Sequence, residues 1–429
     1  MSATASVSLL APDPGVPGRD VLLDDAAMAE RLSRLLSFDG PLPIERYGRG
    51  RVKYRVGDSL RVVHELQIAG APWLVASRTF AGRSQEVYER AARGATEAGP
   101  LRAVAHDPEL EAVFWTFPND RKIGSLAALA PATDTVSRVL GRPIARTELA
   151  AYAPEKSATA ACLDGTGRPV AYAKAFASAE EAAASRHAHE ALFRHVGATH
   201  SALRVPAVLG WSADDRMLIV EALGGRRIDT LLGPDLVRAM RRFGAALACL
   251  HSVPVPDGIP PFGRLDALEQ APAAEIIGRA RPDVAAAAAR LAGELADEVR
   301  EGEAPVCLHG DVHLKNGLLD GRRVALIDLD QAGVGQAAAD LGSVLAGLRY
   351  RALVTDEGAR GEKLRAALVD GYSSLRELPD PDNLRWHVAA ALLTERALRA
   401  VNRFRPAGLA NLGAVLNDAR AVLRGEASR

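Results

Sequence analysis

One segment of this chain restricts its fold more than any other, because it carries polar side chains at fixed intervals. It runs His309-Gly310-Asp311-Val312-His313-Leu314-Lys315-Asn316 and is followed by Ile327-Asp328-Leu329-Asp330. Between them lie two short apolar runs around Asp320-Gly321, a pattern that predicts a β-hairpin. A hairpin returns Asp328 to the neighbourhood of Asn316. The local sequence therefore predicts that Asp311, Asn316 and Asp328 gather at one point.

Two carboxylates and an amide at one point are typical of a phosphoryl-transfer site. Such a site needs a carboxylate beside the attacking hydroxyl and side-chain oxygens that hold Mg²⁺ against the nucleotide phosphates. In the catalytic loop H-R-D-x-x-x-x-N of protein kinases, the base and the metal-ligand asparagine have the same spacing as Asp311 and Asn316. We predict that Asp311 is the catalytic base and that Asn316 and Asp328 are Mg²⁺ ligands.

The polar residues around these three have supporting or structural interpretations. We expect His309 to hold the loop through a backbone contact and Asp340 to anchor it by hydrogen bonds. Asp330 is a candidate contact for the metal or the substrate. His309, Asp311 and His313 alternate along the chain, which leaves a zinc site as an alternative, but no second Cys/His cluster supports one. An isolated His-Gly-Asp or Asp-Leu-Asp would be an ordinary loop; the spacing of the whole set favours phosphoryl transfer.

The segment resembles the aminoglycoside phosphotransferase and choline kinase-like superfamily more than it resembles protein kinases. Glycine stands where protein kinases have arginine, Ile327-Asp328-Leu329-Asp330 replaces Asp-Phe-Gly, and residues 336–342 also fit that superfamily. The resemblance implies an α+β, bilobal protein kinase-like fold, with a small antiparallel sheet in the N-lobe and a mainly helical C-lobe. It also implies ATP or GTP as phosphoryl donor and Mg²⁺ as cofactor.

Upstream of this segment the chain contains an internal repeat. Residues 54–80 and 152–176 each run from a turn through an apolar strand into a second strand, and a helix follows. Arg78 in the first copy occupies the position of Lys174 in the second. In kinase folds a strand lysine contacts the α- and β-phosphates. Lys174 therefore indicates that the second copy binds the nucleotide.

Lys174 is expected to be held by an acidic residue of the following helix, as in kinase folds. Glu190 is the first choice for this partner and Glu181 the second. The alternative is a solvated lysine at a strand end.

Two further parts of the second copy are candidate nucleotide contacts. Residues 154–161 have no glycine-rich signature, but the N–H groups of a tight turn can cradle phosphate without many glycines, so Ser157 is a candidate. By analogy with the superfamily, the hinge at residues 221–223 would meet the nucleobase through its backbone. Glu221 and Leu223 are the candidates there.

The repeat suggests a division of the chain into three parts. Residues 1–130 would form an N-terminal cap, a degenerate copy of an N-lobe that lacks the lysine. Residues 131–223 would form the nucleotide-binding N-lobe, and residues 224–429 the helical catalytic and acceptor-binding C-lobe. This layout is similar to that of maltokinase-like proteins. The alternative is a single enlarged N-lobe.

Composition narrows the classes of partner. The formal net charge is zero and the pI is about 7.2, which gives no support for a nucleic-acid partner. The three cysteines have no paired spacing, so we expect a reducing compartment. The sequence shows no secretory signal and no uncharged stretch of membrane-spanning length. We therefore expect a cytoplasmic protein without a membrane partner.

Charge is also the main indication of the acceptor. From residue 344 onward Arg and Lys outnumber Asp and Glu, and Arg396, Arg399 and Arg403 fall on one helical stripe. A polycationic acceptor would need an acidic pocket, so a neutral or anionic hydroxyl compound, such as a sugar, is favoured. The stripe could instead be a solvated face. An antibiotic-modifying phosphotransferase and a nucleotide-binding pseudoenzyme with a regulatory role are the alternative functions.

Overall fold

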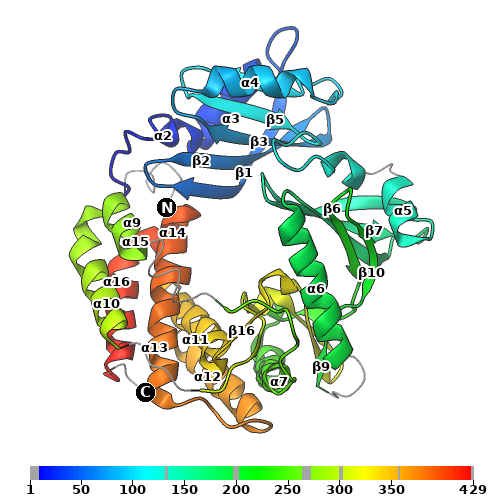
Figure 1. Ribbon diagram of the computed structural model, residues 1–429. Helices are drawn as coiled ribbons and strands as arrows, with labels where there is room; N and C mark the ends of the chain where they lie inside the picture. Colours follow the sequence, from blue (N-terminus) through cyan, green and yellow to red (C-terminus); the bar gives the residue numbers. More distant parts are fainter. Residues whose placement is uncertain are drawn as a thin grey trace.

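The computed structural model describes residues 9–130, 134–196, 202–262, 272–298, 303–355 and 358–426. It has an α+β, bilobal kinase-like fold, with antiparallel sheets in the N-terminal half and helices in the C-terminal half (Figure 1). This confirms the predicted fold class. None of the described helices has both the length and the apolar character needed to cross a membrane.

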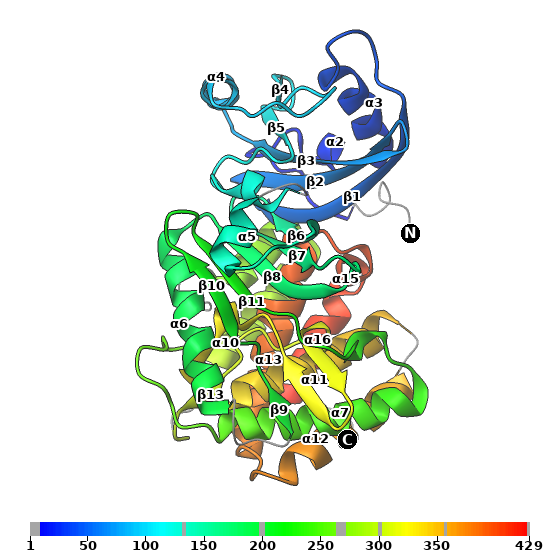
Figure 2. The ribbon, with the colours of Figure 1, turned by 90° about the vertical axis from the view of Figure 1, so that its right-hand side faces the viewer.

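The first sheet has the strand order β1-β2-β3-β5-β4. Its strands are β1 (Ile44–Arg55), β2 (Ser59–Ile68), β3 (Ala71–Thr79), β4 (Val104–Asp107) and β5 (Ala112–Thr116). Alternating apolar residues such as Val52, Tyr54, Leu60 and Val62 are buried, as expected for strands with one face on a core. The helices α2 (Arg19–Leu22), α3 (Asp25–Leu35) and α4 (Ser84–Arg93) flank this sheet (Figures 1 and 2).

The second sheet repeats this topology, with the order β10-β11-β8-β7-β6. It consists of β6 (Arg146–Ala153), β7 (Ser157–Leu163), β8 (Pro169–Phe176), β10 (Val208–Ser212) and β11 (Met217–Glu221), and α6 (Ala179–Val196) follows β8 as α4 follows β3. Arg78 and Lys174 occupy matching places, since Arg78 pairs with Val113 of β5 and Lys174 with Leu218 of β11. The predicted internal repeat is thus a repeat of structure.

The boundary between the two sheets is shared. The short helix η1 (Leu126–Leu129) and Val136 of α5 (Asp134–Leu140) pack with the core of the second sheet, in a cluster that also includes Val63 and Ala76 of the first. The three-part division at residues 130 and 223 stays a prediction. By its packing, η1 belongs with the second sheet.

The C-terminal half is mainly helical. Its helices are α7 (Gly233–His251), α9 (Ala273–Ala280), α10 (Ala285–Asp297), α11 (Ala337–Val354), α12 (Gly358–Ser373), α13 (Pro381–Ala391), α14 (Leu398–Asn402), α15 (Pro406–Ala410) and α16 (Leu412–Leu423). A π-helical segment, η6 (Leu392–Ala397), joins α13 to α14. In α7 the residues Leu236, Met240, Phe243 and Leu247 are buried at helical spacing, which fixes the helix in the core.

Two small sheets carry the polar segment. The predicted hairpin is confirmed as β14 (Gly317–Asp320) and β15 (Arg323–Leu326), which pair from Gly317 with Leu326 to Asp320 with Arg323. They are joined by β12 (Arg226–Arg227) and β9 (Leu203–Arg204). Beside them, β13 (Val306–Leu308) pairs with β16 (Gly333–Gly335).

The first sheet and the helical half share one hydrophobic core. One buried cluster runs from Leu10, Leu22 and Leu60 to Leu412 and Val415 of α16. The Ala11 N–H donates to the Ala280 carbonyl oxygen at 2.9 Å. The Arg49 guanidinium lies 5.1 Å from the ring centre of Phe404. The N-terminal part is therefore packed against the C-lobe as well as against the second sheet.

Candidate active site

The loop after β13 is held by the carboxylate of Asp340, in the first turn of α11. Its oxygens accept the backbone N–H groups of His309, at 2.7 Å, and Gly310, at 3.0 Å. Asp340 is only 1% exposed, and its Oδ2 also lies 3.3 Å from Nε2 of His251. Burial alone would raise the pKa of Asp340, but the hydrogen bond and charge of His251 and the contacts with His309 lower it. The carboxylate therefore stays ionised as an anchor of the loop.

Gly310 allows the sharp turn of this loop. Its φ is +77°, and a Cβ there would lie 1.9 Å from the carbonyl oxygen of Gln331. Only glycine fits such a position. This explains why glycine replaces the arginine of the protein-kinase pattern.

His309 bridges the two halves of the polar segment. Its Nε2 lies 3.0 Å from the carbonyl oxygen of Ile327, and the Asp311 N–H lies 3.4 Å from its Nδ1. Because a carbonyl can only accept, Nε2 carries the proton and Nδ1 accepts. The ring thus ties the backbone at Asp311 to the residue before Asp328.

Asp311 faces cationic and polar groups. Its Oδ1 lies 3.0 Å from Nε2 of His313 and 3.4 Å from Nη2 of Arg399. Burial by itself would raise the pKa of Asp311, but the His313 hydrogen bond and the charges of His313, Arg399 and Lys315 lower it well below its usual value. Asp311 is therefore a carboxylate and a weak base in this structure.

Asn316 lies beside Asp311 and Asp328 through backbone contacts. Asn316 ends the short helix η4 (Leu314–Asn316), and its side-chain Nδ2 donates to the Asp311 carbonyl oxygen at 3.0 Å. The Asn316 carbonyl oxygen in turn accepts the Ile327 N–H at 2.9 Å. The hairpin therefore returns the chain to Asn316 as predicted. With the amide nitrogen occupied, the amide oxygen is left as the acceptor.

Asp328 has a left-handed backbone, with φ +63° and ψ +58°. Its Oδ1 lies 3.0 Å from Nζ of Lys174. Burial would raise its pKa, but Lys174 lowers it, so the carboxylate is charged. The amide oxygen of Asn316 and the second carboxylate oxygen of Asp328 are hard donors of the kind Mg²⁺ takes, so these residues fit the ion. Within the described ranges no group of three or more His, Cys, Asp or Glu is arranged for a metal, which gives the zinc alternative no support.

The partner of Lys174 differs from the prediction. Lys174 contacts Asp328 and, more closely, Asp330, whose other oxygen accepts the Ser185 hydroxyl of α6 at 2.8 Å. Glu190 instead lies 3.7 Å from Arg186 on the outer side of the same helix. The prediction that Glu190 holds Lys174 is therefore wrong for this structure, because α6 turns Ser185 toward Asp330, the carboxylate that holds the lysine.

The other predicted nucleotide contacts lie at the second sheet. Ser157 is buried at the start of β7, where it pairs with Phe176. Glu221 ends β11, and its carboxylate lies 3.1 Å from Arg204. Leu223 follows, half-buried, outside the strand. Their roles toward a nucleotide stay predictions.

Glu155, in the turn before Ser157, is a residue that sequence reasoning missed. Its side chain is 4% exposed and is shared by Arg61 at 2.9 Å, Arg121 at 2.6 Å and Arg78. Its φ is +60°, where the matching turn of the first sheet has Gly57, at +76°. In the sequence, a glutamate at the position where the first copy has glycine could have indicated that this residue is held by a specific contact. Through it, Arg78 of the first sheet holds the candidate phosphate turn of the second.

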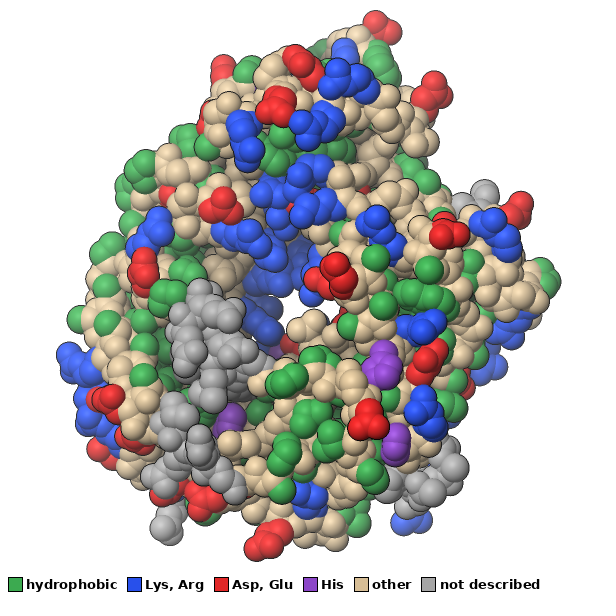
Figure 3. Space-filling view, viewed as in Figure 1, with side chains coloured by type: hydrophobic (Ala, Val, Ile, Leu, Met, Phe, Trp, Pro, Cys, Tyr) green, Lys and Arg blue, Asp and Glu red, His purple; other side chains and the backbone are tan. Residues whose placement is uncertain are grey.

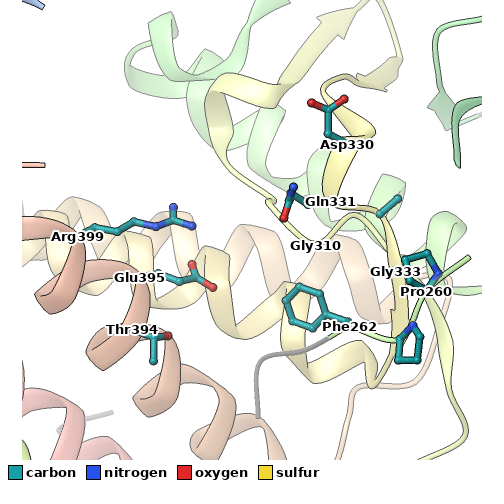
Figure 4. Close-up of a pocket in the computed structure, with 11 residues that line it drawn as sticks. Pro260, Phe262, Gly310, Asp330, Gln331, Gly333, Thr394, Glu395 and Arg399 are labelled. Carbon is teal, nitrogen blue, oxygen red and sulfur yellow. The ribbon is translucent and has the colours of Figure 1, made fainter. Parts of the chain in front are cut away.

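A cavity of about 360 Å³ opens beside the loop (Figure 4). Its lining residues are Pro260, Pro261, Phe262, Gly310, Asp330, Gln331, Ala332, Gly333, Thr394, Glu395 and Arg399. Glu395 and Arg399 come from the π-helical segment and α14, while Phe262 lies on the opposite wall. The cavity thus lies between the loop after β13 and the helical half.

The arginine stripe of the C-lobe is not a solvated face. Arg396 is 8% exposed and donates to the Ser343 carbonyl oxygen at 2.7 Å, Arg399 meets Asp311, and Arg403 is half-buried. Trp386 is also buried, with its Nε1 donating to the Leu295 carbonyl oxygen at 2.8 Å. It belongs to the core and not to the cavity.

The sequence and the fold were compared with known proteins. The model of the phosphotransferase enzyme family matches residues 158–387. No curated protein matches the chain.

Similar solved structures include two aminoglycoside phosphotransferases and a macrolide phosphotransferase. A thermostable mutant of an aminoglycoside phosphotransferase, in complex with AMP-PNP and hygromycin B, is 16% identical, covers 69% of this chain and 100% of its own, and has a TM-score of 0.48. An aminoglycoside phosphotransferase from Streptomyces rimosus, in complex with ADP and streptomycin, is 22% identical over 55% of this chain and 90% of its own, with a TM-score of 0.40. A macrolide 2'-phosphotransferase from Brachybacterium faecium is 19% identical over 63% and 90%, with a TM-score of 0.41.

Proposed function

Because this chain belongs to the phosphotransferase enzyme family, we propose that it transfers the γ-phosphate of ATP or GTP to a hydroxyl group of a small molecule. The observation that carries this proposal is the grouping of Asp311, Asn316, Asp328 and Lys174. The Asn316 side-chain amide donates to the Asp311 carbonyl oxygen at 3.0 Å, and Lys174 Nζ lies 3.0 Å from Asp328 Oδ1. These are the side-chain types that a phosphoryl-transfer site needs.

Asp311 is proposed to position the acceptor hydroxyl and to take its proton. Its lowered pKa makes it a weak base, so it would accept the proton late, after the bond between the γ-phosphorus and the leaving oxygen of ADP or GDP has weakened. That order suits the loose transition state of phosphoryl transfer, in which the attacking hydroxyl becomes acidic only late. Positioning is then its larger contribution.

Lys174 is proposed to contact the nucleotide phosphates. It lies at the end of a buried strand with its charge already balanced by Asp328 and Asp330, so it is held in place before a nucleotide arrives. Asn316 and Asp328 would hold Mg²⁺, which neutralises charge on the phosphates when bound. The carboxylates near Lys174 also keep it charged, because their attraction outweighs the desolvation of the ammonium group.

The cavity beside Gly310 is the proposed place of the acceptor. Its lining includes the guanidinium of Arg399 and the carboxylates of Glu395 and Asp330, of which Asp330 is paired with Lys174. The aromatic face of Phe262 also lines it. An acceptor with apolar and hydroxyl-bearing faces fits such walls. Among the described lining residues Glu395 is the one carboxylate besides the lysine-paired Asp330, and Arg399 offsets its charge, whereas a polycationic aminoglycoside would require a strongly acidic pocket.

The test is acceptor-dependent formation of ADP or GDP by the purified protein with Mg²⁺, over a panel of sugars, sugar phosphates, amino sugars, aminoglycosides and small alcohols. Asp311→Asn should lower kcat about 10²- to 10⁴-fold while leaving the affinity for ATP nearly unchanged. Asp320→Asn is the control, since Asp320 lies in the hairpin turn with its side chain 49% exposed. Nucleotide binding without turnover on any acceptor, or full activity of Asp311→Asn, would refute the proposal.

A further inference from the structure

A second pocket lies between the first sheet, the β6–β7 turn and the end of α14, and cations dominate its lining. The lining residues are Arg51, Lys53, Arg61, Ala153, Pro154, Lys156 and Arg403. They come from three parts of the chain far apart in sequence. Figure 3 shows Lys and Arg side chains gathered around the central hollow below the first sheet.

These cations are largely without carboxylate partners. Within the described residues, Arg51, Lys53, Lys156 and Arg403 form no ion pair within 4.0 Å. Arg61 does pair with Glu155, at 2.9 Å, but its buried Nε has no hydrogen-bond partner. Glu155 is itself shared among three arginines, so the pocket keeps a positive charge that no described side chain balances.

The crowding of these cations lowers the pKa of two of them. Desolvation, then repulsion by Arg55, Arg61, Arg403 and Lys156, lowers the pKa of Lys53 to about 8. Desolvation, then repulsion by Arg51 and Arg399, lowers the pKa of Arg403 to about 10. A protein gains nothing in stability from such a cluster. A bound anion would turn the repulsion into attraction.

The pocket is adjacent to the proposed transfer point. Arg399, which contacts Asp311 at 3.4 Å, lies one helical turn before Arg403. The charge of Arg51 acts on both Asp328 and Asp311. Lys174, the cation proposed for the nucleotide, pairs with Asp328 and Asp330 and is not among the residues that line this pocket. The pocket therefore adjoins Asp311 through Arg403 and Arg51, and its opposite wall is the β6–β7 turn, the candidate phosphate turn.

We propose that the acceptor carries an anionic group, a phosphate or a carboxylate, and that Lys53, Arg403 and Arg51 bind this group while the acceptor hydroxyl lies at Asp311. This inference rests on the proposed function and names its substrate class. It also assigns a functional role to the N-terminal part, because Arg51 and Lys53 lie on β1. The first sheet would then complete the acceptor site instead of binding a second nucleotide.

The first experiment measures anion binding by titration calorimetry, with inorganic phosphate and citrate as separate probes on the full-length protein. Wild type should bind at least one of them, and the stronger probe identifies the phosphate or the carboxylate source. The double variant Lys53→Met, Arg403→Met should bind it about tenfold more weakly or worse. Arg46→Met is the matched control, since Arg46 also lies on β1 but is exposed and does not line the pocket.

The second experiment separates the acceptor from the nucleotide. The double variant should keep its affinity for Mg²⁺–ATP within about twofold, while kcat/KM for an anionic acceptor falls at least tenfold. A comparable loss of nucleotide affinity would assign the cluster to the triphosphate and overturn the inference. So would no anion binding by wild type, or equal binding by all variants. If a neutral acceptor is phosphorylated equally well by wild type and the double variant, the inference fails while the proposed function stands.

Discussion

At the scale of single residues, Gly310 and Asp340 show how the catalytic loop is built. Asp340 accepts two consecutive backbone N–H groups, and the turn that presents them needs the positive φ of Gly310. The loop is thus set by backbone geometry, and Asp311 is aimed by its neighbours in the chain.

Gly310→Ala should lower the free energy of unfolding by about 3 kcal/mol, because a left-handed alanine costs about 1–2 kcal/mol and the clash with Gln331 adds about 1–3 kcal/mol. Gly321→Ala is the control, since Gly321 has φ +57° but open space around it. That variant should lose only about 1 kcal/mol. Urea unfolding of both measures the difference, and equal losses would show that the contact with Gln331 has no cost.

The pKa of Asp311 predicts a pH effect. In the folded protein the pKa of Asp311 lies below the usual aspartate value of about 3.9. The Asp311 carboxylate is therefore ionised at every pH above about 3.9 and takes up its proton only at lower pH. His313→Ala removes the main group that lowers this pKa, and burial then raises it. The ratio of kcat/KM of the variant to that of wild type should therefore fall as the pH drops from about 6 to 4. A ratio independent of pH would contradict the assignment.

At the scale of elements, the β6–β7 turn is the point where the two sheets meet. Three arginines of the first part, Arg61, Arg78 and Arg121, converge on Glu155. Asp120 adds to the contact by accepting the Tyr152 hydroxyl at 2.7 Å and the Glu155 N–H at 3.0 Å. The turn is therefore held from outside its own sheet.

Glu155→Gln should lower the free energy of unfolding at pH 7 by about 3 kcal/mol, because it leaves buried guanidinium groups without their counter-charge. Burial opposes ionisation of Glu155, but Arg121, Arg61 and Arg78 lower its pKa. Its stabilising contribution is therefore complete above the unfolded pKa of about 4.3 and is lost as the pH falls through the lower folded pKa. The difference from wild type should shrink in that acidic range.

The control for this prediction is Glu148→Gln on β6, the strand that leads into this turn. Glu148 pairs with Arg146 at 2.7 Å, but both side chains are 57% exposed. Its loss should stay below about 1 kcal/mol. Equal effects of the two substitutions would show that the three-arginine contact does not hold the turn.

At the scale of the whole molecule, the first sheet is continuous with the helical half. The shared hydrophobic cluster and the Arg49–Phe404 contact join β1 to the segment after α14. Relative motion is the usual expectation for domains with small polar interfaces. A shared apolar core instead favours unfolding as one unit.

Single-tryptophan variants can test this unity. Trp115 reports on the first sheet and Trp386 on the helical half, and both are buried. The fluorescence of the two tryptophans should give the same urea midpoint. Phe404→Ala should lower both midpoints together, which corresponds to a loss of about 3 kcal/mol in the free energy of unfolding. Two separate midpoints in wild type, or a shift of only one, would show that the parts unfold independently.

The sequence by itself determined the local features of this protein. The interval from Asp311 to Asn316, the hairpin around Asp320-Gly321 and the repeated strand order all depend on neighbouring residues and on strand periodicity, which the chain displays directly. The fold class followed from these features together with the resemblance of their motifs.

Only the tertiary structure decided which distant side chains meet. Lys174 contacts Asp330 and not Glu190 because the rotation of α6 presents Ser185, and a rotation of that kind is set by packing and not by spacing. The gathering of Lys53 and Arg403 likewise depends on how β1 docks on the helical half. Long-range contacts of this sort depend on the balance of packing over the whole core, which no local pattern records.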